Sequence, residues 1–199
     1  MSYLTENLKT VEANVQSACE KAERQRNDVL LIAVSKTKPI ALLTEAYQCG
    51  IRDFGENRVQ ELVQKAESLP ADIHWHMIGH LQKNKVKPAV RHAYLIHSVD
   101  SYALAKTISD EAVKQAKNVS ILLEVNIAEE ESKFGYSATE VLADISQIAT
   151  LPNIQVKGLM TIAPYTENAE SNRIYFEQLK QLSVDIRNKN IDNVSMDVL

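Results

Sequence analysis

Glycine, proline and cysteine are scarce in this chain, which has five glycines, five prolines and two cysteines among 199 residues. It contains no glycine-rich linker, no low-complexity tract and no run near the roughly 20 apolar residues of a membrane-spanning helix. The first residues lack the basic start of a signal peptide, so we expect a cytoplasmic protein. Neither Cys19 nor Cys49 has a second cysteine or a histidine at metal-ligand spacing, which predicts two reduced thiols.

Basic residues are also too few to form a strongly cationic surface. The chain has 22 lysines and arginines against 26 acidic residues, which gives a formal net charge of −4 at pH 7. This balance argues against nucleic acid or an anionic membrane as the main partner. Glycine-rich phosphate loops and the Gly-x-Ser-x-Gly nucleophile motif are absent as well. Nucleotide-dependent transfer and serine hydrolysis are therefore disfavoured.

The chain does contain a regular alternation of short β-branched apolar runs with longer stretches of helical spacing. This pattern predicts one α/β domain over residues 1–199 with a parallel sheet, for which a (β/α)8 TIM barrel is the closed form. The seventh strand begins at Val194, about one βα unit short of a barrel, so we expect a truncated version of a longer protein with open sheet edges. The expected strands are 29–36, 51–55, 74–78, 94–99, 120–127, 154–163 and 194–199.

Lys36 stands at the end of an otherwise apolar predicted strand, which is typical of a parallel strand buried on both faces. Strand alternation places its side chain on the same face as Ile32 and Val34, at the end of the strand where α/β proteins bind ligands. Desolvation there would disfavour the ammonium and prepare the amine to form a Schiff base. A lysine whose stem covers apolar surface while its amine reaches solvent fits the same spacing equally well.

Polar side chains also follow other predicted strands. Asn57 follows the second strand, His80 follows the third, and Met160 lies near the end of the sixth. Because the carboxyl ends of parallel strands share one rim, we expect these residues to converge. A polar surface loop around His80 and a core methionine at 160 explain the same pattern more simply. Lys133 follows an acidic run, which is compatible with a lid over the rim or with an ordinary solvated loop.

His74 and His76 lie two residues apart on a predicted strand and so share a face. Some metal-dependent barrel hydrolases present a pair of ligands in this way. Such a site needs further ligands from other strand ends, and a His-x-His pair alone is weak evidence. We therefore assign no metal ligand, and a metal-dependent hydrolase stays a rival interpretation.

Five segments, taken together and in this order, resemble the pyridoxal phosphate homeostasis protein family. The match is highly specific as a set and spans residues 33–160. The family resembles the barrel domain of bacterial alanine racemase standing alone, which implies a TIM barrel of the alanine racemase N-terminal type. The segments are AVSKTKP at 33–39, FGENRVQE at 54–61, WHMIGHLQKNK at 75–85, SKFG at 132–135 and GLM at 158–160.

The resemblance implies that pyridoxal 5′-phosphate (PLP) is the cofactor and that Lys36 holds it in an internal aldimine. It also implies that Asn57, His80 and Met160 lie near the cofactor. Alanine racemase pairs its lysine with a tyrosine base from a second domain, which this sequence does not supply. The implied role is therefore non-catalytic storage and delivery of PLP in intracellular homeostasis, by a monomer whose partners include apo-enzymes. A PLP-dependent racemase or decarboxylase is the alternative.

One departure from the family concerns the residues after Met196. In the family, the strand that begins at Val194 leads into a Ser/Gly/Met loop and an Arg-Ile-Gly strand, which bind the phosphate and face the pyridine nitrogen. The present sequence ends at Leu199 without them. Without those donors the cofactor loses charge-assisted hydrogen bonds worth roughly 1.5–3 kcal/mol each. We therefore expect the 199-residue chain to bind PLP weakly or not at all, and a longer parent to bind it well.

Overall fold

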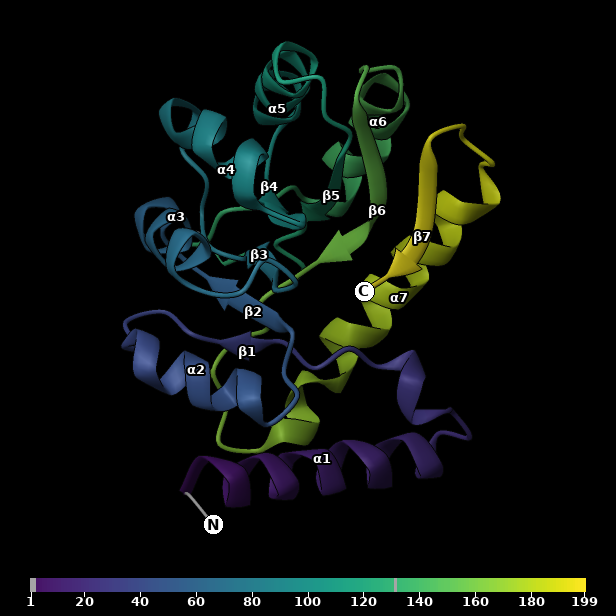
Figure 1. Ribbon diagram of the computed structural model, residues 1–199. Helices are drawn as coiled ribbons and strands as arrows, with labels where there is room; N and C mark the ends of the chain where they lie inside the picture. Colours follow the sequence, from purple (N-terminus) through teal and green to yellow (C-terminus); the bar gives the residue numbers. More distant parts are fainter. Residues whose placement is uncertain (1–2, 131) are drawn as a thin grey trace.

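Seven parallel strands form one curved sheet in the computed structural model, which describes residues 3–130 and 132–199 (Figure 1). The strands lie in the order in which they occur in the chain, and helices cover the outer face of the sheet. This order confirms the predicted α/β class with its repeated βα units. The strands are β1 (Ala33–Val34), β2 (Asp53–Glu56), β3 (His74–Met77), β4 (Leu95–Val99), β5 (Val119–Glu124), β6 (Ile154–Met160) and β7 (Val194–Val198).

Local sequence signals explain where several helices begin. Ser137 precedes one of them, and its hydroxyl accepts the Glu140 N–H at 3.2 Å while the Glu140 carboxylate accepts the Ser137 N–H at 2.8 Å. These two backbone N–H groups at the start of the helix, which have no partner within it, are thus both hydrogen-bonded, as in a capping box. The helices are α1 (Tyr3–Lys21), α2 (Ile40–Gln48), α3 (Val59–Ser68), α4 (Val86–His92), α5 (Tyr102–Lys114), α6 (Ala138–Ala149) and α7 (Arg173–Asn188), with 3-10 turns at Arg26–Asp28, Lys83–Lys85 and Ala169–Asn172.

The hydrophobic core fills the layer between the sheet and its helices. Phe54 of β2 is the register partner of Trp75 of β3, and the centroids of their buried rings are 5.7 Å apart. Leu62 of α3 and Ile145 of α6 are fully buried. Each such aliphatic side chain contributes roughly 1.5–3 kcal/mol on burial. This layer holds the strands in register and so places all their carboxyl ends along one rim.

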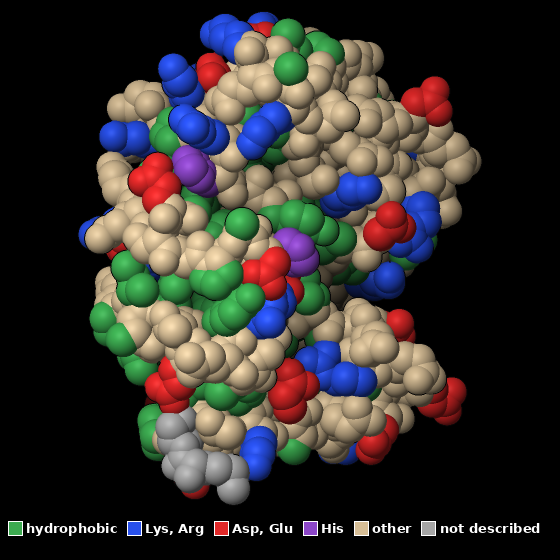
Figure 2. All heavy atoms as spheres, viewed as in Figure 1, with side chains coloured by type: hydrophobic (Ala, Val, Ile, Leu, Met, Phe, Trp, Pro, Cys, Tyr) green, Lys and Arg blue, Asp and Glu red, His purple; other side chains and the backbone are tan. Residues whose placement is uncertain are grey.

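The expectation of a long, buried first strand is wrong. β1 comprises only two residues, and Leu30 and Val34 are 59% and 51% exposed. The apolar run stays uncovered because β1 lies at one edge of the sheet and pairs only with β2. β7 forms the other edge. Hydrophobic side chains are also visible among charged ones across the middle of the face drawn in Figure 2.

β6 and β7 approach each other unusually closely at Gly158. A Cβ atom at this position would lie 1.8 Å from the carbonyl oxygen of Val198. The register between the two strands also shifts between Val156 and Gly158. Glycine is therefore required here because a neighbouring backbone occupies the space of a side chain.

Cys19 and Cys49 are both free thiols, as expected from their spacing. Cys19 is the buried residue of α1, and Cys49 follows the last turn of α2. Within the described ranges, no helix combines the length and the apolar character that crossing a membrane requires.

Candidate functional site

Lys36 lies in a tight turn that follows β1. The Ser35 carbonyl accepts the Lys38 N–H at 3.0 Å, and Thr37 has a φ of +61°. Positive φ is unfavourable for a β-branched residue, so other contacts must hold the turn. Ser35 is buried, whereas Lys36 is exposed. The expectation of a desolvated amine is therefore wrong, because the edge strand also leaves Val34 on the same face half exposed.

A buried ion triad formed by Glu56, Lys65 and Glu61 lies behind this turn. The Lys65 ammonium is 2.7 Å from the Glu56 carboxylate and 3.1 Å from that of Glu61. The Ser35 hydroxyl donates to the same Glu56 oxygen at 2.6 Å, and the Thr37 N–H donates to Glu61 at 2.8 Å. The Thr37 N–H, followed by the Lys65 ammonium, lowers the pKa of Glu61. Sequence reasoning missed this triad, although Glu61 and Lys65 have the i, i+4 spacing of a helical ion pair.

Asn57 and His80 reach the rim through two loops in backbone contact. A Cβ on Gly79 would lie 2.5 Å from the Asn57 carbonyl oxygen, so glycine permits this approach. The Asn57 Oδ1 atom is buried and has no hydrogen-bond partner among the described residues, which leaves an acceptor available. His80 Nδ1 lies 3.2 Å from the Asp100 carboxylate. The other side of the site is formed by Phe134, which stacks on His80 with ring centroids 3.8 Å apart.

Lys133 links the loop after β5 to the segment after β6. Its ammonium forms an ion pair with Glu130 and donates to the Ile162 carbonyl at 3.2 Å. The next residue, Phe134, stacks on His80. This loop therefore belongs to the rim, and its position is set by contacts on both sides.

Met160 ends β6 opposite Glu124 of β5, which is its register partner. Glu124 is only 8% exposed, and burial raises the pKa of its carboxyl to about 7, with a further increase from the Asp100 carboxylate. Sequence reasoning did not identify this acid. The available signal was a carboxylate that directly follows the apolar residues Ile121, Leu122 and Leu123 at the end of a strand.

The raised pKa predicts that Glu124→Gln stabilises the protein at alkaline pH. The unfolded carboxyl titrates near 4.5 and the folded one near 7, so the folded state loses stability as pH rises through this window. At about pH 8.5 the variant should unfold with a free energy about 1–3 kcal/mol higher than the parent, while at about pH 4 the two should match. Urea unfolding at both pH values measures the difference. A gain of equal size at both would contradict the assigned pKa.

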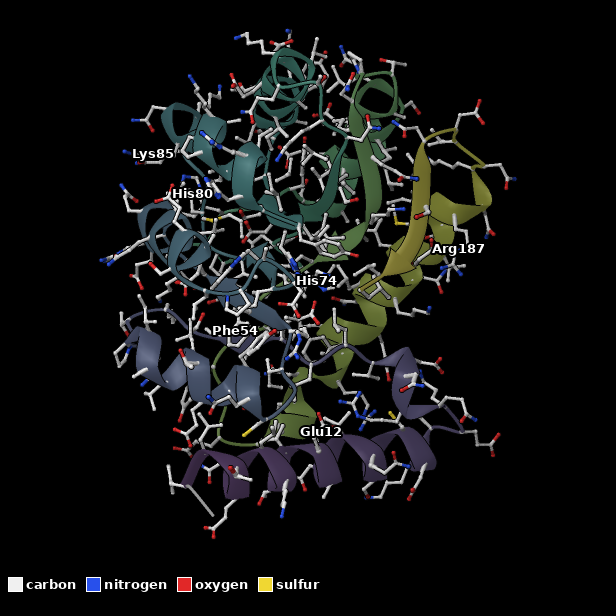
Figure 3. All side chains as sticks on the ribbon, in the orientation of Figure 1. Glu12, Phe54, His74, His80, Lys85 and Arg187 are labelled. Carbon is white, nitrogen blue, oxygen red and sulfur yellow. The ribbon has the colours of Figure 1, made fainter. Side chains whose placement is uncertain are left out.

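His74 and His76 form a different cluster, at the amino ends of the strands. His74 Nδ1 and His76 Nε2 lie 3.1 and 3.0 Å from one oxygen of Asp53, and His76 Nδ1 lies 2.9 Å from His97 Nε2. Figure 3 shows His74 well separated from His80. Over residues 3–130 and 132–199, no three His, Cys, Asp or Glu side chains are grouped so that they could hold a metal ion. The two histidines thus share a carboxylate, which does not support the hydrolase interpretation.

Burial keeps the inner histidines of this cluster neutral. It lowers the pKa of His97 to about 3, and it also lowers the pKa of His76 despite the adjacent Asp53 carboxylate. The outer histidine, His74, is stacked on Tyr94 with ring centroids 4.4 Å apart. At neutral pH His76 and His97 therefore carry no charge.

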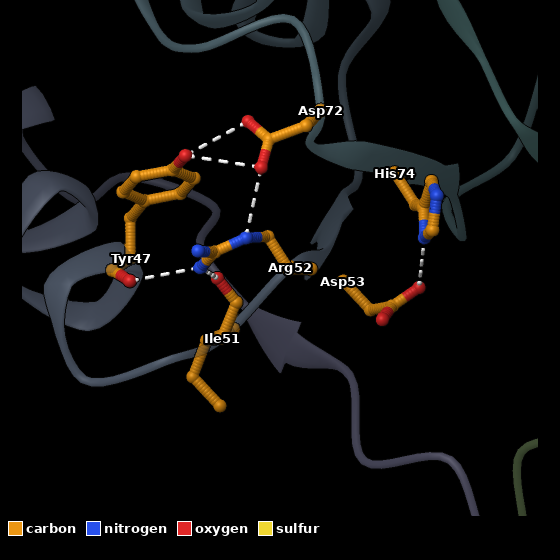
Figure 4. A network of polar contacts seen from close by, with 6 residues as sticks. All are labelled: Tyr47, Ile51, Arg52, Asp53, Asp72 and His74. Atoms are coloured by element: carbon orange, nitrogen blue, oxygen red, sulfur yellow. Dashed lines mark hydrogen bonds and ion pairs between the residues drawn. The ribbon is translucent and has the colours of Figure 1, made fainter.

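A surface network braces the start of β2 beside this cluster (Figure 4). The Arg52 guanidinium lies 3.8 Å above the Tyr47 ring and donates to Asp72 at 3.0 Å. The Tyr47 hydroxyl donates to the same carboxylate at 2.9 Å and is the main cause of the lowered pKa of Asp72. These contacts join α2 to the segment before β3. The network is exposed, and we assign it a structural role.

The four residues expected near a cofactor come from four strands. Lys36 follows β1, Asn57 follows β2, His80 follows β3, and Met160 ends β6. The parallel order places all four on one rim. Asn57 meets the loop of His80 through Gly79, whereas Met160 lies farther along the sheet beside β5.

Residues 7–197 match the family model of the alanine racemase N-terminal domain. The chain is 42% identical over 183 residues to the pyridoxal phosphate homeostasis protein of Aquifex aeolicus, which covers 92% of this chain and 80% of the relative. It is 36% identical over 197 residues to the protein of the same name from Pseudomonas aeruginosa. This alignment covers 98% of this chain and 85% of the relative.

Solved structures show the same fold. PipY of Synechococcus elongatus, solved with PLP bound, matches with a TM-score of 0.78 at 33% identity, over 92% of this chain and 85% of PipY. Alanine racemase of Clostridium difficile matches with a TM-score of 0.76 over 97% of this chain and 49% of the racemase. Its identity of 11% supports a shared fold alone.

Proposed function

Because this chain belongs to the pyridoxal phosphate homeostasis protein family, we propose that it binds PLP as a Schiff base on Lys36. The observation that carries the proposal is the exposed Lys36, which follows the carboxyl end of β1 on a turn held by hydrogen bonds to Glu56 and Glu61. A relative of 33% identity solved with PLP bound supports the same assignment. When bound, the cofactor supplies an aldehyde carbon that an amine can attack.

The other rim residues have complementary roles in this proposal. The buried, unpartnered Oδ1 of Asn57 is suited to accept a hydrogen bond from a polar group of the ligand. His80 is oriented from two sides, by Asp100 and by Phe134, and so can present one ring nitrogen in a defined direction. Met160 offers apolar contact beside Glu124. These roles fit recognition of a polar aromatic aldehyde.

We further propose that the role is storage and delivery of PLP in the cytoplasm, by a monomer that passes the cofactor to apo-enzymes. Turnover would need an acid or base opposite Lys36. Burial, followed by the Asp144 carboxylate, raises the pKa of the Tyr136 hydroxyl above its ordinary value of 10, so this hydroxyl stays protonated at pH 7. The homeostasis names of the curated relatives agree with a carrier.

Borohydride trapping tests the proposed attachment. PLP is added in large excess, because the 199-residue chain lacks the expected phosphate donors and should bind the cofactor weakly. Before reduction we expect a visible absorption band, and after reduction we expect peptide mapping to find the label on Lys36. Lys36→Ala should abolish both while leaving the circular dichroism spectrum unchanged. Lys38→Ala, two residues away on the same exposed loop, is the matched control and should retain both. A folded protein without label on Lys36 would refute the attachment.

Glu124 is the observation that favours the alternative, a racemase or decarboxylase, because a carboxyl with a pKa of about 7 can exchange protons at neutral pH. This alternative predicts that the PLP-loaded protein removes the optical activity of an L-amino acid or releases carbon dioxide. Under the carrier proposal, polarimetry and carbon dioxide measurements should show neither change above the background of free PLP.

A further inference from the structure

We propose that the buried ion triad of Glu56, Lys65 and Glu61 positions Lys36 for reaction with an aldehyde, an inference that rests on the proposed function. The contacts of the triad are made to the two residues on either side of Lys36. The triad therefore acts on the direction of the lysine side chain through the backbone, and its members are positioning residues.

Ser35, the residue before the lysine, forms hydrogen bonds with its N–H, its hydroxyl and its carbonyl. The Ser35 N–H donates to the Gly55 carbonyl at 2.9 Å, and the Ser35 hydroxyl donates to Glu56 at 2.6 Å. The Ser35 carbonyl accepts from the Lys65 ammonium at 2.8 Å and from the Lys38 N–H at 3.0 Å. Rotation of this residue would leave buried donors and acceptors unpaired. The backbone entering Lys36 is thus fixed in one conformation.

The residue after the lysine is held in a conformation that it would otherwise avoid. Thr37 has a φ of +61°, and its N–H donates to the Glu61 carboxylate at 2.8 Å. That carboxylate is anchored in turn by the Lys65 ammonium at 3.1 Å. With both neighbours held, the Cα–Cβ bond of Lys36 has one direction, on the face opposite to Ser35. Restriction of this kind favours reaction because fewer orientations must be lost on the way to it.

Residues 36–39 of the turn are exposed on its outer side. An open groove of about 460 Å³ lies there, lined in part by Thr37, Glu61 and Lys65. Lys65 is nevertheless only 5% exposed and Glu56 is fully buried. Buried ion pairs are often no more stabilising than apolar residues of similar size, whereas they define the geometry of the groups they bond. The burial of Glu56 and Lys65 behind an exposed turn therefore indicates that the triad fixes the geometry of the turn more than it stabilises the fold.

Glu61→Ala provides the main test, because Glu61 lies at the edge of the triad and its side chain is 22% exposed. In the parent, brief treatment with limiting PLP and borohydride should label Lys36 in preference to Lys38. In the variant this ratio should fall about threefold or more, and the Thr37 amide should exchange about fivefold faster or more, measured without cofactor by NMR. Glu67→Ala, on the exposed side of the same helix, is the matched control and should change neither quantity.

A second variant covers the buried pair. Lys65→Met combined with Glu56→Gln removes the two buried charges together and leaves only the Glu61 carboxylate, whose side chain is 22% exposed. This variant should lower the ratio in the same way. Unchanged labelling of Lys36 in folded variants whose Thr37 amide exchanges faster would overturn the inference and leave the proposed function intact. Absence of preferential Lys36 labelling in the parent would instead overturn the proposed function, and the inference with it.

Discussion

Gly158→Ala is expected to unfold the chain or to lower its free energy of unfolding by about 3 kcal/mol or more. The added Cβ would lie 1.8 Å from the Val198 carbonyl oxygen, which belongs to the backbone of the neighbouring strand. A flexible side chain could move aside, but a strand can move only if its ladder with β6 breaks. Urea unfolding followed by circular dichroism measures the loss.

Gly50→Ala is the matched control for this prediction. Gly50 has a φ of +98°, but a Cβ there would meet no atom within 4 Å. Its replacement should therefore cost only the backbone strain, about 1–2 kcal/mol. Similar losses at Gly50 and Gly158 would show that β7 shifts to relieve the contact, which would contradict the requirement for glycine at position 158.

Acid is expected to destabilise the protein through His97. Its pKa is about 3 in the folded state and near 6.5 when unfolded, so the stability it contributes is complete above pH 6.5 and is lost as pH falls toward 3. Between about pH 7.5 and pH 5 this contribution should fall by about 2 kcal/mol. The physical cause is burial, because His97 would have to accept a proton beside His76 with no carboxylate of its own.

The measurement compares the parent with His97→Gln, in urea, at both pH values. The variant should lack the 2 kcal/mol dependence, a magnitude that follows from about 1.4 kcal/mol per pKa unit. The comparison must be made between proteins, because the Glu124 carboxyl changes stability in the opposite direction over the same window. His74→Gln replaces the partly exposed histidine of the cluster and should keep the parental dependence. Identical slopes in the parent and His97→Gln would contradict the prediction.

Much of the fold could be predicted because the periodicity of apolar residues is a local property. Each expected strand exists, with boundaries that differ by at most four residues at either end. Burial of the first strand was mispredicted because it depends on a neighbour across the sheet. An apolar run does not reveal whether the strand will have a neighbour on both sides. β1 pairs with a strand on one side alone, and that strand is β2.

Only those parts of the candidate site could be predicted that follow from the positions of strand ends or from the family resemblance. Those arguments place Lys36 and Asn57 on adjacent strand ends, which the structure shows. They do not reveal the ion triad or the cluster of Asp53, His76 and His97, because each brings together residues from different strands and helices. Burial of these groups is a property of tertiary packing, and a single sequence gives no direct measure of it.

The sequential order of the strands has a consequence for synthesis on the ribosome. Ala33 pairs with Phe54 and His76 pairs with Leu95, so these early strands meet their partners after about twenty further residues have emerged. The later pairs, Val119 with Ile154 and Val156 with Val194, need longer stretches of chain. The turn that carries Lys36 needs only β2 and α3, which ends at Ser68. The turn that carries Lys36 can therefore form while most of the sheet is still being translated.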